Sequence, residues 1–235
     1  MKQSKSVLCV DILTIFPEVC APYIKASILG RAQQETARHT PKLHITIHQL
    51  RQWTHDRHHS VDDKPFGGGP GMVMKVEPFH AALCALKLRT KTGKLASASK
   101  RSRIILTSAK GKLFTQSDAQ RLTQYERLVF LCGRYEGVDE RVAEHLADEE
   151  FSIGPYVVTG GELPALVMLD AIARLLPGVL GAAESLDEES WSHSVVKEYP
   201  QYTRPAVYLG WKVPQLLLSG DHRKIVEWRK QAQSM

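Results

Sequence analysis

The segment Leu128–Arg141, with the sequence LVFLCGRYEGVDER, decides the fold class of this 235-residue chain. Its first four residues are a short, continuously apolar run, which is typical of a strand buried on both faces of a parallel sheet. From Cys132 the run changes into a loop of glycines, charged residues and one tyrosine. A polar, glycine-rich loop at the carboxyl end of a strand is where open α/β sheets bind ligands. We therefore expect residues 132–141 to form one wall of a binding pocket.

Two further loops of this kind lie elsewhere in the chain. Residues 152–162 read SIGPYVVTGGE, and residues 107–112 read TSAKGK directly after the apolar run 104–106. Residues 107–112 alone would be an ordinary strand–helix turn, but together the loops predict one shared pocket. None matches the G-x-G-x-x-G dinucleotide fingerprint, and no G-x-S-x-G nucleophile motif is present. We expect Asp139 and Glu140 in the first turn of a helix, where acids complement the helix dipole.

Strand-like and helix-like segments alternate along the chain. The strands are expected at residues 7–15, 43–47, 104–106 and 128–131, and the helices at residues 17–34, 77–88, 114–125, 138–146 and 163–176. This alternation predicts an α/β fold with a mostly parallel sheet covered on both faces. Residues 1–180 form the expected main domain. Residues 181–200 have few aliphatic side chains and several acids, so we expect a linker there. Residues 201–235 then form a small, helical C-terminal domain.

The composition indicates a soluble globular protein, with 43% hydrophobic and 24% charged residues. No apolar run approaches the roughly 18 residues that a membrane span requires. The four cysteines lie far apart without a C-x-x-C pair, so reduced thiols and a cytoplasmic location are expected. The net charge is +6, and residues 87–112 contain nine Lys or Arg and no Asp or Glu. Such basicity is compatible with a nucleic-acid partner but does not by itself establish one.

Residues 54–72, THDRHHSVDDKPFGGGPGM, form a long polar loop. Its three histidines and three aspartates invite a metal site, but no pair has helical H-x-x-x-H spacing together with a further ligand, so no metal is expected. The simplest interpretation is a loop with turn glycines. A sharper one is contact with an anion or RNA, because backbone N–H groups at glycines can approach phosphates and Arg57 and Lys64 supply positive charge.

The tail after residue 199 mixes bases with aromatic side chains, among them Arg204, Trp211 and Trp228. This mixture suits contact with an RNA backbone and stacking on bases. It suits a small core with a basic rim equally well, and the sequence alone leaves both interpretations open.

With these motifs in view, the chain closely resembles the bacterial tRNA (guanine-N1)-methyltransferases, the TrmD type of the trefoil-knot (SPOUT) methyltransferase family. The resemblance extends over nearly the whole chain. It is carried by the loop 54–72 and by CGRYEGVDERV, SIGPYVVTGGELPA, RLLPGVLG and YPQYTRP, which begin at residues 132, 152, 174 and 199.

The resemblance implies an α/β domain with a deep C-terminal trefoil knot, working as a homodimer with active sites at the subunit interface. It implies S-adenosylmethionine as methyl donor, with magnesium as an assisting ion. The acceptor would be N1 of guanine 37 in tRNAs with G36-G37. The alternatives are a catalytically weak tRNA-binding relative and a knotted enzyme that methylates a ribose 2′-hydroxyl.

The resemblance also implies roles for individual residues. Donor binding would fall to Thr107, Ser108, Ala109, Gly111, Gly133, Arg134, Tyr135, Glu136, Gly137, Ser152, Ile153, Gly154, Tyr156, Val158, Gly160 and Gly161. The adenine would be read by backbone groups of Ile153, Gly154, Tyr156 and Val158. The tRNA would be contacted by Asp56, Arg57, Lys64, Gly69 and Arg204.

Two residues would be catalytic. Arg174 would stabilise charge on guanine O6, and Glu189 would remove the N1 proton. Here the chain departs from the family pattern, because Glu189-Ser190-Trp191 replaces the usual Asp-Ser-Phe, and Asp187 is a competing base. Pro155 replaces a more polar residue and removes one backbone N–H from the adenine loop. The chain ends soon after Arg229, where relatives continue, so a shortened C-terminal domain is expected.

Overall fold

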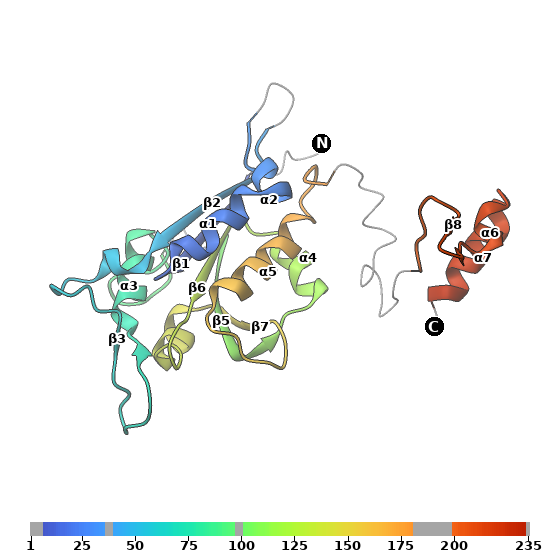
Figure 1. Ribbon diagram of the computed structural model, residues 1–235. Helices are drawn as coiled ribbons and strands as arrows, with labels where there is room; N and C mark the ends of the chain where they lie inside the picture. Colours follow the sequence, from blue (N-terminus) through green and yellow to red (C-terminus); the bar gives the residue numbers. More distant parts are fainter. Residues whose placement is uncertain (1–6, 36–39, 97–100, 181–198, 234–235) are drawn as a thin grey trace. The chain divides into compact units, whose positions relative to one another are not determined.

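The computed structural model describes residues 7–35, 40–96, 101–180 and 199–233. The chain divides into two compact units, Met1–Gly181 and Ala182–Met235 (Figure 1). Among the described residues, no helix is both long and apolar enough to cross a membrane.

The first unit is built on a five-stranded sheet in the order β2-β1-β6-β5-β7. Every pairing in it is parallel, which confirms the predicted α/β fold with a mostly parallel sheet. The strands are β1 (Leu8–Thr14), β2 (Leu43–Gln49), β5 (Ser102–Leu113), β6 (Arg127–Cys132) and β7 (Glu149–Ser152).

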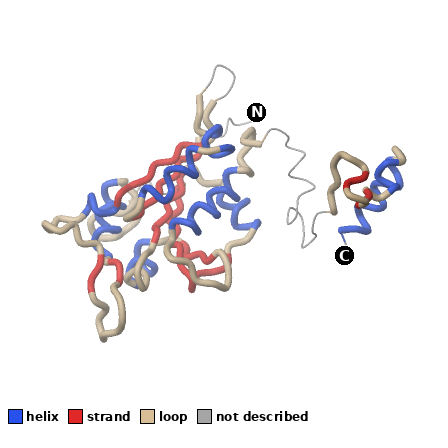
Figure 2. Tube along the Cα trace, in the orientation of Figure 1, coloured by secondary structure: helices blue, strands red, loops and turns tan. Residues whose placement is uncertain are grey.

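Helices cover both faces of this sheet (Figure 2). One face packs against α1 (Pro17–Lys25), α2 (Ser27–Ala32), α4 (Gln116–Leu122) and α5 (Glu162–Ala173). The other packs against α3 (Val76–Ala85), the 3-10 turn η1 (Leu50–Trp53) and the π-helical turn η3 (Val142–Leu146).

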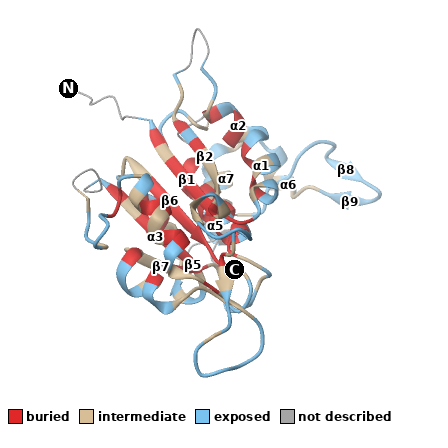
Figure 3. Ribbon diagram, turned by 90° about the vertical axis from the view of Figure 1, so that its left-hand side faces the viewer, coloured by how far each residue is buried: buried red, intermediate tan, exposed pale blue. Residues whose placement is uncertain are grey.

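The strand β6 shows why its sequence is apolar without alternation. Leu128 and Phe130 belong to the core on one face, whereas Val129 and Leu131 belong to the core on the other. All four are fully buried, and Figure 3 shows buried residues along the central strands β1 and β6. A continuously apolar strand therefore indicates a sheet whose two faces are both covered by helices.

The structure corrects four local expectations. The helix expected at residues 17–34 is two helices, separated at Ala26, which has extended backbone angles. The helix expected at residues 138–146 is slightly shorter: helical residues run from Glu140 to Leu146, and the last five form the π-helical turn η3. The strand expected at residues 104–106 extends from Ser102 to Leu113. The long loop contains a small antiparallel hairpin of β3 (Asp62–Asp63) and β4 (Val73–Met74).

The edge strand β7 carries a charge cluster that gives a first prediction. Glu149 accepts hydrogen bonds from Arg103 Nε (2.5 Å) and from Arg121 Nη2 (2.6 Å). Burial would raise the pKa of Glu149, but the hydrogen bonds from Arg121 and Arg103 outweigh burial and lower it. The stabilisation is therefore present above the carboxyl's unfolded pKa and is lost as the pH falls through its lower folded pKa.

We accordingly expect Glu149→Gln to lower the urea midpoint at pH 7 and to flatten the fall of that midpoint as the pH drops below the ordinary carboxyl pKa of about 4.3. Glu126→Gln is the control, because Glu126 pairs with Arg101 in a pair whose side chains are 40% and 71% exposed. Exposed pairs contribute little to stability. Parallel acid profiles for the wild type and Glu149→Gln would contradict this account.

The second unit, Ala182–Met235, has its own small set of strands and helices. It contains the two-stranded hairpin of β8 (Val207–Tyr208) and β9 (Trp211–Lys212), followed by α6 (Gln215–Leu218) and α7 (His222–Gln233). The Asp221 carboxylate accepts the backbone N–H groups of Arg223 and Lys224, both at 3.2 Å, and so caps α7.

Candidate functional site

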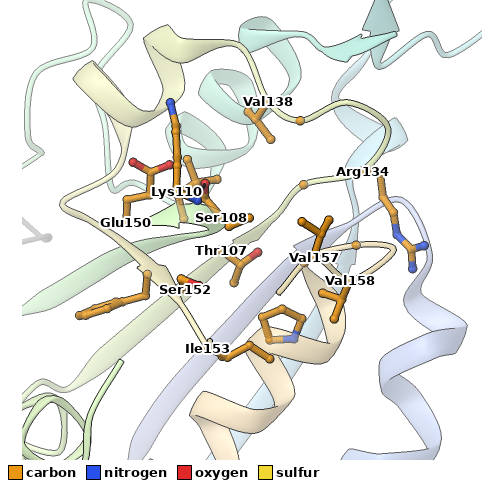
Figure 4. A pocket seen from close by; sticks show the side chains of 18 of the residues that line it. Thr107, Ser108, Lys110, Arg134, Val138, Glu150, Ser152, Ile153, Val157 and Val158 are labelled. Atoms are coloured by element: carbon orange, nitrogen blue, oxygen red, sulfur yellow. Dashed lines mark hydrogen bonds between the residues drawn. The ribbon is translucent and has the colours of Figure 1, made fainter. Parts of the chain in front are cut away.

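A cavity of about 470 Å³ lies where the loops after β6 and β7 meet the distal part of β5 (Figure 4). Its walls come from the three loops singled out in the sequence. The lining residues are Leu106 to Lys110, Gly133 to Val138, Glu140, Ala143, Glu150 to Ile153, Tyr156 to Gly161 and Pro164. The cavity thus occupies the position expected for a ligand site in a parallel sheet.

A bulge in β5 forms one wall. Thr107 and Lys112 both pair with Phe151 of β7, so residues 108–111 leave the ladder between them. Gly111 permits this bulge, since a Cβ there would lie 2.7 Å from the backbone carbonyl carbon of Glu150. The bulge turns Ser108, Ala109 and Lys110 towards the cavity.

The loops converge at Gly161. Its backbone N–H donates to the Gly133 carbonyl oxygen at 2.8 Å. A Cβ at Gly161 would lie 2.0 Å from Thr107 Oγ1, 2.8 Å from the Gly133 nitrogen and 2.9 Å from the Cys132 Cα. A glycine at this position therefore lets the ends of β5 and β6 approach the start of α5.

The carboxylate of Glu162 holds two of these walls together. It is completely buried and accepts hydrogen bonds from Thr14 Oγ1 (2.5 Å) and Arg134 Nε (2.8 Å). The Arg134 guanidinium also stacks 4.7 Å from the centre of the Phe16 ring and donates to the Thr159 carbonyl at 3.3 Å. Arg134 is thereby fixed between β1, β6 and α5.

The loop 133–139 is also tied to the long loop 54–72. Met74 N–H donates to Gly137 O (2.9 Å), Asp139 N–H donates to Met74 O (2.9 Å), and Glu136 N–H donates to Met72 O (3.0 Å). This connection brings the end of the long loop beside the cavity. Asp139 keeps a local role, because its carboxylate accepts the Arg141 backbone N–H at 3.0 Å.

Nearly all the residues predicted to bind a donor line this cavity; Gly111 and Gly154 do not. Gly154 is engaged within its own loop, where its N–H donates to Ser152 Oγ (3.3 Å) and its carbonyl accepts Tyr156 N–H (2.9 Å). Lys110, within the predicted loop 107–112, also lines the cavity. The sequence interpretation gave Glu140 only a place in the first turn of a helix, and it missed Glu150, which comes two residues before a predicted loop; both line the cavity.

The predicted tRNA-binding residues lie outside the cavity. Asp56 organises its own loop by accepting Ser60 N–H (3.0 Å) and Ser60 Oγ–H (2.8 Å), which lower its pKa. Arg57, Lys64 and Gly69 are exposed on the same loop, and Arg204 is exposed in the second unit. Among the described residues, no group of His, Cys, Asp and Glu is arranged to hold a metal ion.

The predicted catalytic residues are placed differently from the donor-binding ones. Arg174 is the C-cap of α5 and does not line the cavity, whereas Pro164 in the first turn of the same helix does. At 1.5 Å per residue, the helix separates the two ends by about 15 Å. Glu189 and its competitor Asp187 lie outside the described residues.

The buried cysteines offer no nucleophile to this site. Burial raises the pKa of Cys20 to about 11, and the pKa of Cys132 is raised well above its usual value for the same reason. Both thiols are therefore protonated near neutral pH, and reactive cysteine chemistry requires the thiolate.

Comparisons with known proteins identify the family of this chain. A family model described as tRNA (Guanine-1)-methyltransferase TrmD matches residues 8–235. Three similar relatives are each named tRNA (guanine-N(1)-)-methyltransferase. A protein of Chloroflexus aggregans is 49% identical over 220 residues, covering 94% of this chain and 80% of the relative. One of Carboxydothermus hydrogenoformans is 48% identical over 223 residues (94% and 81%), and one of Dehalococcoides mccartyi is 44% identical over 221 residues (94% and 84%). A match of this extent shows that the chain belongs to the tRNA (guanine-1)-methyltransferase TrmD family.

Proposed function

We propose that this chain transfers a methyl group from S-adenosylmethionine to N1 of guanine 37 in tRNAs with G36-G37. The observation that carries the proposal is the cavity, whose walls are the loops predicted to bind the donor, in a chain of the TrmD family. Its volume of about 470 Å³ lies in the ordinary range for small-molecule sites.

The residues present fit such a donor. Ile153, Val157, Val158 and Pro164 offer apolar surface for an adenine ring, and Lys110 and Glu150 offer charge at the other side of the cavity (Figure 4). A buried oxygen of Glu150 has no hydrogen-bond partner within the described structure, which suits a ligand with a donor group. When bound, S-adenosylmethionine supplies an electrophilic methyl group on a sulfonium.

The chain's own residues would handle the proton and the charge on the acceptor. Guanine N1 carries a proton and is a poor nucleophile, so a base must remove it, and we propose Glu189 for this role. Glutamate has nearly the same acidity as the family's usual aspartate and is one methylene longer. We propose that Arg174 stabilises the negative charge that builds on O6.

The position of Arg174 supports a homodimer. Because α5 separates it from the cavity of its own chain, we propose that it serves the cavity of a partner subunit. Arg174 follows Leu163 and Val167 at positions i, i+4 and i+11 of α5, on one face of the helix. Leu163 and Val167 are 55% and 45% exposed, and Val19 on neighbouring α1 is 43% exposed. This apolar surface is the proposed subunit interface.

The remaining proposals follow from the family. We propose that residues 1–180 contain a deep trefoil knot, that residues 181–200 link the domains, and that residues 201–235 contact tRNA through Arg204 and its neighbours. Asp56, Arg57, Lys64 and Gly69 would contact tRNA from the long loop. Magnesium is the proposed assisting ion, and the cytoplasm, where tRNA is modified, is the proposed place of action.

The decisive experiment is methyl transfer to unmodified tRNA transcripts that differ only at positions 36 and 37. We expect transfer to G36-G37 and strongly reduced transfer to A36-G37 and G36-A37, with the methyl group mapped to N1. Binding of tRNA without transfer would instead indicate a catalytically weak relative. A methyl group mapped to a ribose 2′-oxygen would indicate the other alternative.

A further inference from the structure

We propose that Lys110 and Glu150 together form a subsite for the zwitterionic amino-acid end of the methyl donor. The Lys110 ammonium would bind its carboxylate, and the Glu150 carboxylate would bind its ammonium. This inference rests on the proposed function. It adds a reason why the site would distinguish a donor with an intact amino-acid end from a bare thioadenosine.

The backbone places the two side chains together. Glu150 lies on β7 opposite Leu106 of β5, directly before the point where β5 bulges. Lys110 belongs to that bulge, and Gly111 closes the bulge against the backbone of Glu150. Both side chains line the cavity, and Figure 4 shows them beside one another, on the side away from Arg134.

One carboxylate oxygen of Glu150 lacks a hydrogen-bond donor among the described residues. Its Oε1 is buried, yet within the described part of the chain it accepts no hydrogen bond. A buried carboxylate oxygen without a donor is costly, so such atoms need an explanation. An ammonium group brings three N–H donors and a positive charge, and would satisfy this oxygen.

The present partner of the Lys110 ammonium is one that a ligand carboxylate can displace. Its ammonium forms an ion pair with Glu140, which also lines the cavity, and the two side chains are 58% and 57% exposed. Exposed pairs contribute little free energy, so a ligand carboxylate can replace or share this partner. The hydrogen bond to Glu140 and the nearby charge of Glu150 raise the pKa of Lys110, so its positive charge is maintained.

The arginine that lines the cavity is less suited to this role than Lys110. Arg134 is committed to Glu162, Thr159 and the Phe16 ring on the opposite side. The apolar side chains of Val157 and Val158 line the cavity and suit the adenine end. The distribution of charge therefore gives the donor one orientation, with its amino-acid end towards the β5 bulge.

The test compares ligands that differ only at the amino-acid end. Calorimetric binding of S-adenosylhomocysteine and of 5′-methylthioadenosine would be measured for the wild type, Lys110→Met and Glu150→Gln. We expect each substitution to weaken the binding of S-adenosylhomocysteine roughly 10- to 100-fold, which is the range for the loss of a hydrogen bond between charged groups. Methylthioadenosine lacks the amino-acid end, so its affinity should change less than about twofold.

Two analogues of S-adenosylhomocysteine, one without the carboxylate and one without the amino group, assign the partners individually. Lys110→Met should not weaken binding of the analogue that lacks the carboxylate. Glu150→Gln should not weaken binding of the analogue that lacks the amino group. Glu144→Gln is the matched control, because Glu144 lies near Lys110 and contributes to its raised pKa but does not line the cavity. It should leave all affinities unchanged.

Equal weakening of S-adenosylhomocysteine and methylthioadenosine would overturn the subsite, since it would mean that the two residues only shape the cavity. Unchanged affinities in both variants would overturn it as well. Retained binding of methylthioadenosine shows that a variant is folded. A wild type that binds neither ligand would refute the proposed function itself, which is a different result from failure of the subsite alone.

Discussion

Replacement of Arg174 by alanine is expected to lower the rate of methyl transfer by about 10²- to 10³-fold, the typical effect of removing one group that stabilises developing negative charge. The affinity for S-adenosylhomocysteine should stay unchanged, because the role proposed for Arg174 is contact with O6 of the acceptor guanine and not with the donor. Single-turnover transfer to G36-G37 tRNA and calorimetric binding measure the two effects separately.

Two companion variants sharpen this prediction. Arg174→Lys keeps the charge but loses the planar, forked donor geometry, so it should recover only part of the rate. Glu189→Gln should abolish transfer while the donor still binds, and wild-type activity in that variant would move the role of base to Asp187. Equal losses of rate and donor affinity in Arg174→Ala would contradict its placement on the acceptor.

Replacement of Gly161 by alanine is expected to reduce donor affinity by roughly 10- to 100-fold and to destabilise the first unit by about 1–3 kcal/mol, as overpacking does. The added methyl group would meet Thr107 Oγ1 at 2.0 Å and the backbone at Gly133 and Cys132 at 2.8 and 2.9 Å. Opening this junction would separate the loops that line the cavity. Thermal unfolding and binding of S-adenosylhomocysteine test both effects.

Thr107→Ala provides the control for this clash. It removes the nearest obstacle but leaves the two backbone contacts, so the double variant with Gly161→Ala should recover only part of the lost affinity. Thr107 Oγ1 also donates to the Leu131 carbonyl at 3.2 Å, so the single variant has a small cost of its own. Full recovery in the double variant would show that the clash with the Thr107 hydroxyl, rather than the clash with the backbone of Gly133 and Cys132, causes the loss of donor affinity.

The fold was predictable where burial dictates composition. The strands β1, β2, β5 and β6 contain apolar or alternating runs that the sequence displays directly. The strand β7, with the sequence EEFS, was missed because it lies at the sheet edge and its two acids serve Arg121, Arg103 and the cavity rather than a core. The extra length of β5 was missed because the bulge after Thr107 interrupts any periodicity.

The candidate site likewise has features that the sequence predicts and features that it does not. Convergence of the three loops was predictable, because the carboxyl ends of neighbouring parallel strands meet at one edge. The roles of Glu162 and Glu150 were not. A glutamate in the first turn of a helix normally complements the dipole in solvent, so nothing in the sequence indicated that Glu162 is buried against Thr14 and Arg134. Burial of one Glu150 oxygen depends on the bulge of another strand.

Gly111 and Gly161, where the strands and loops around the cavity meet, also bear on how the protein would respond to an inhibitor that fills the cavity. Resistance commonly requires a substitution that obstructs the drug and spares the natural ligand. At Gly111 and Gly161, however, any side chain meets neighbouring backbone at less than 3 Å, so the substitution damages the site itself. Selection for escape would therefore be directed to cavity side chains that are given no contact with the donor, such as Glu140.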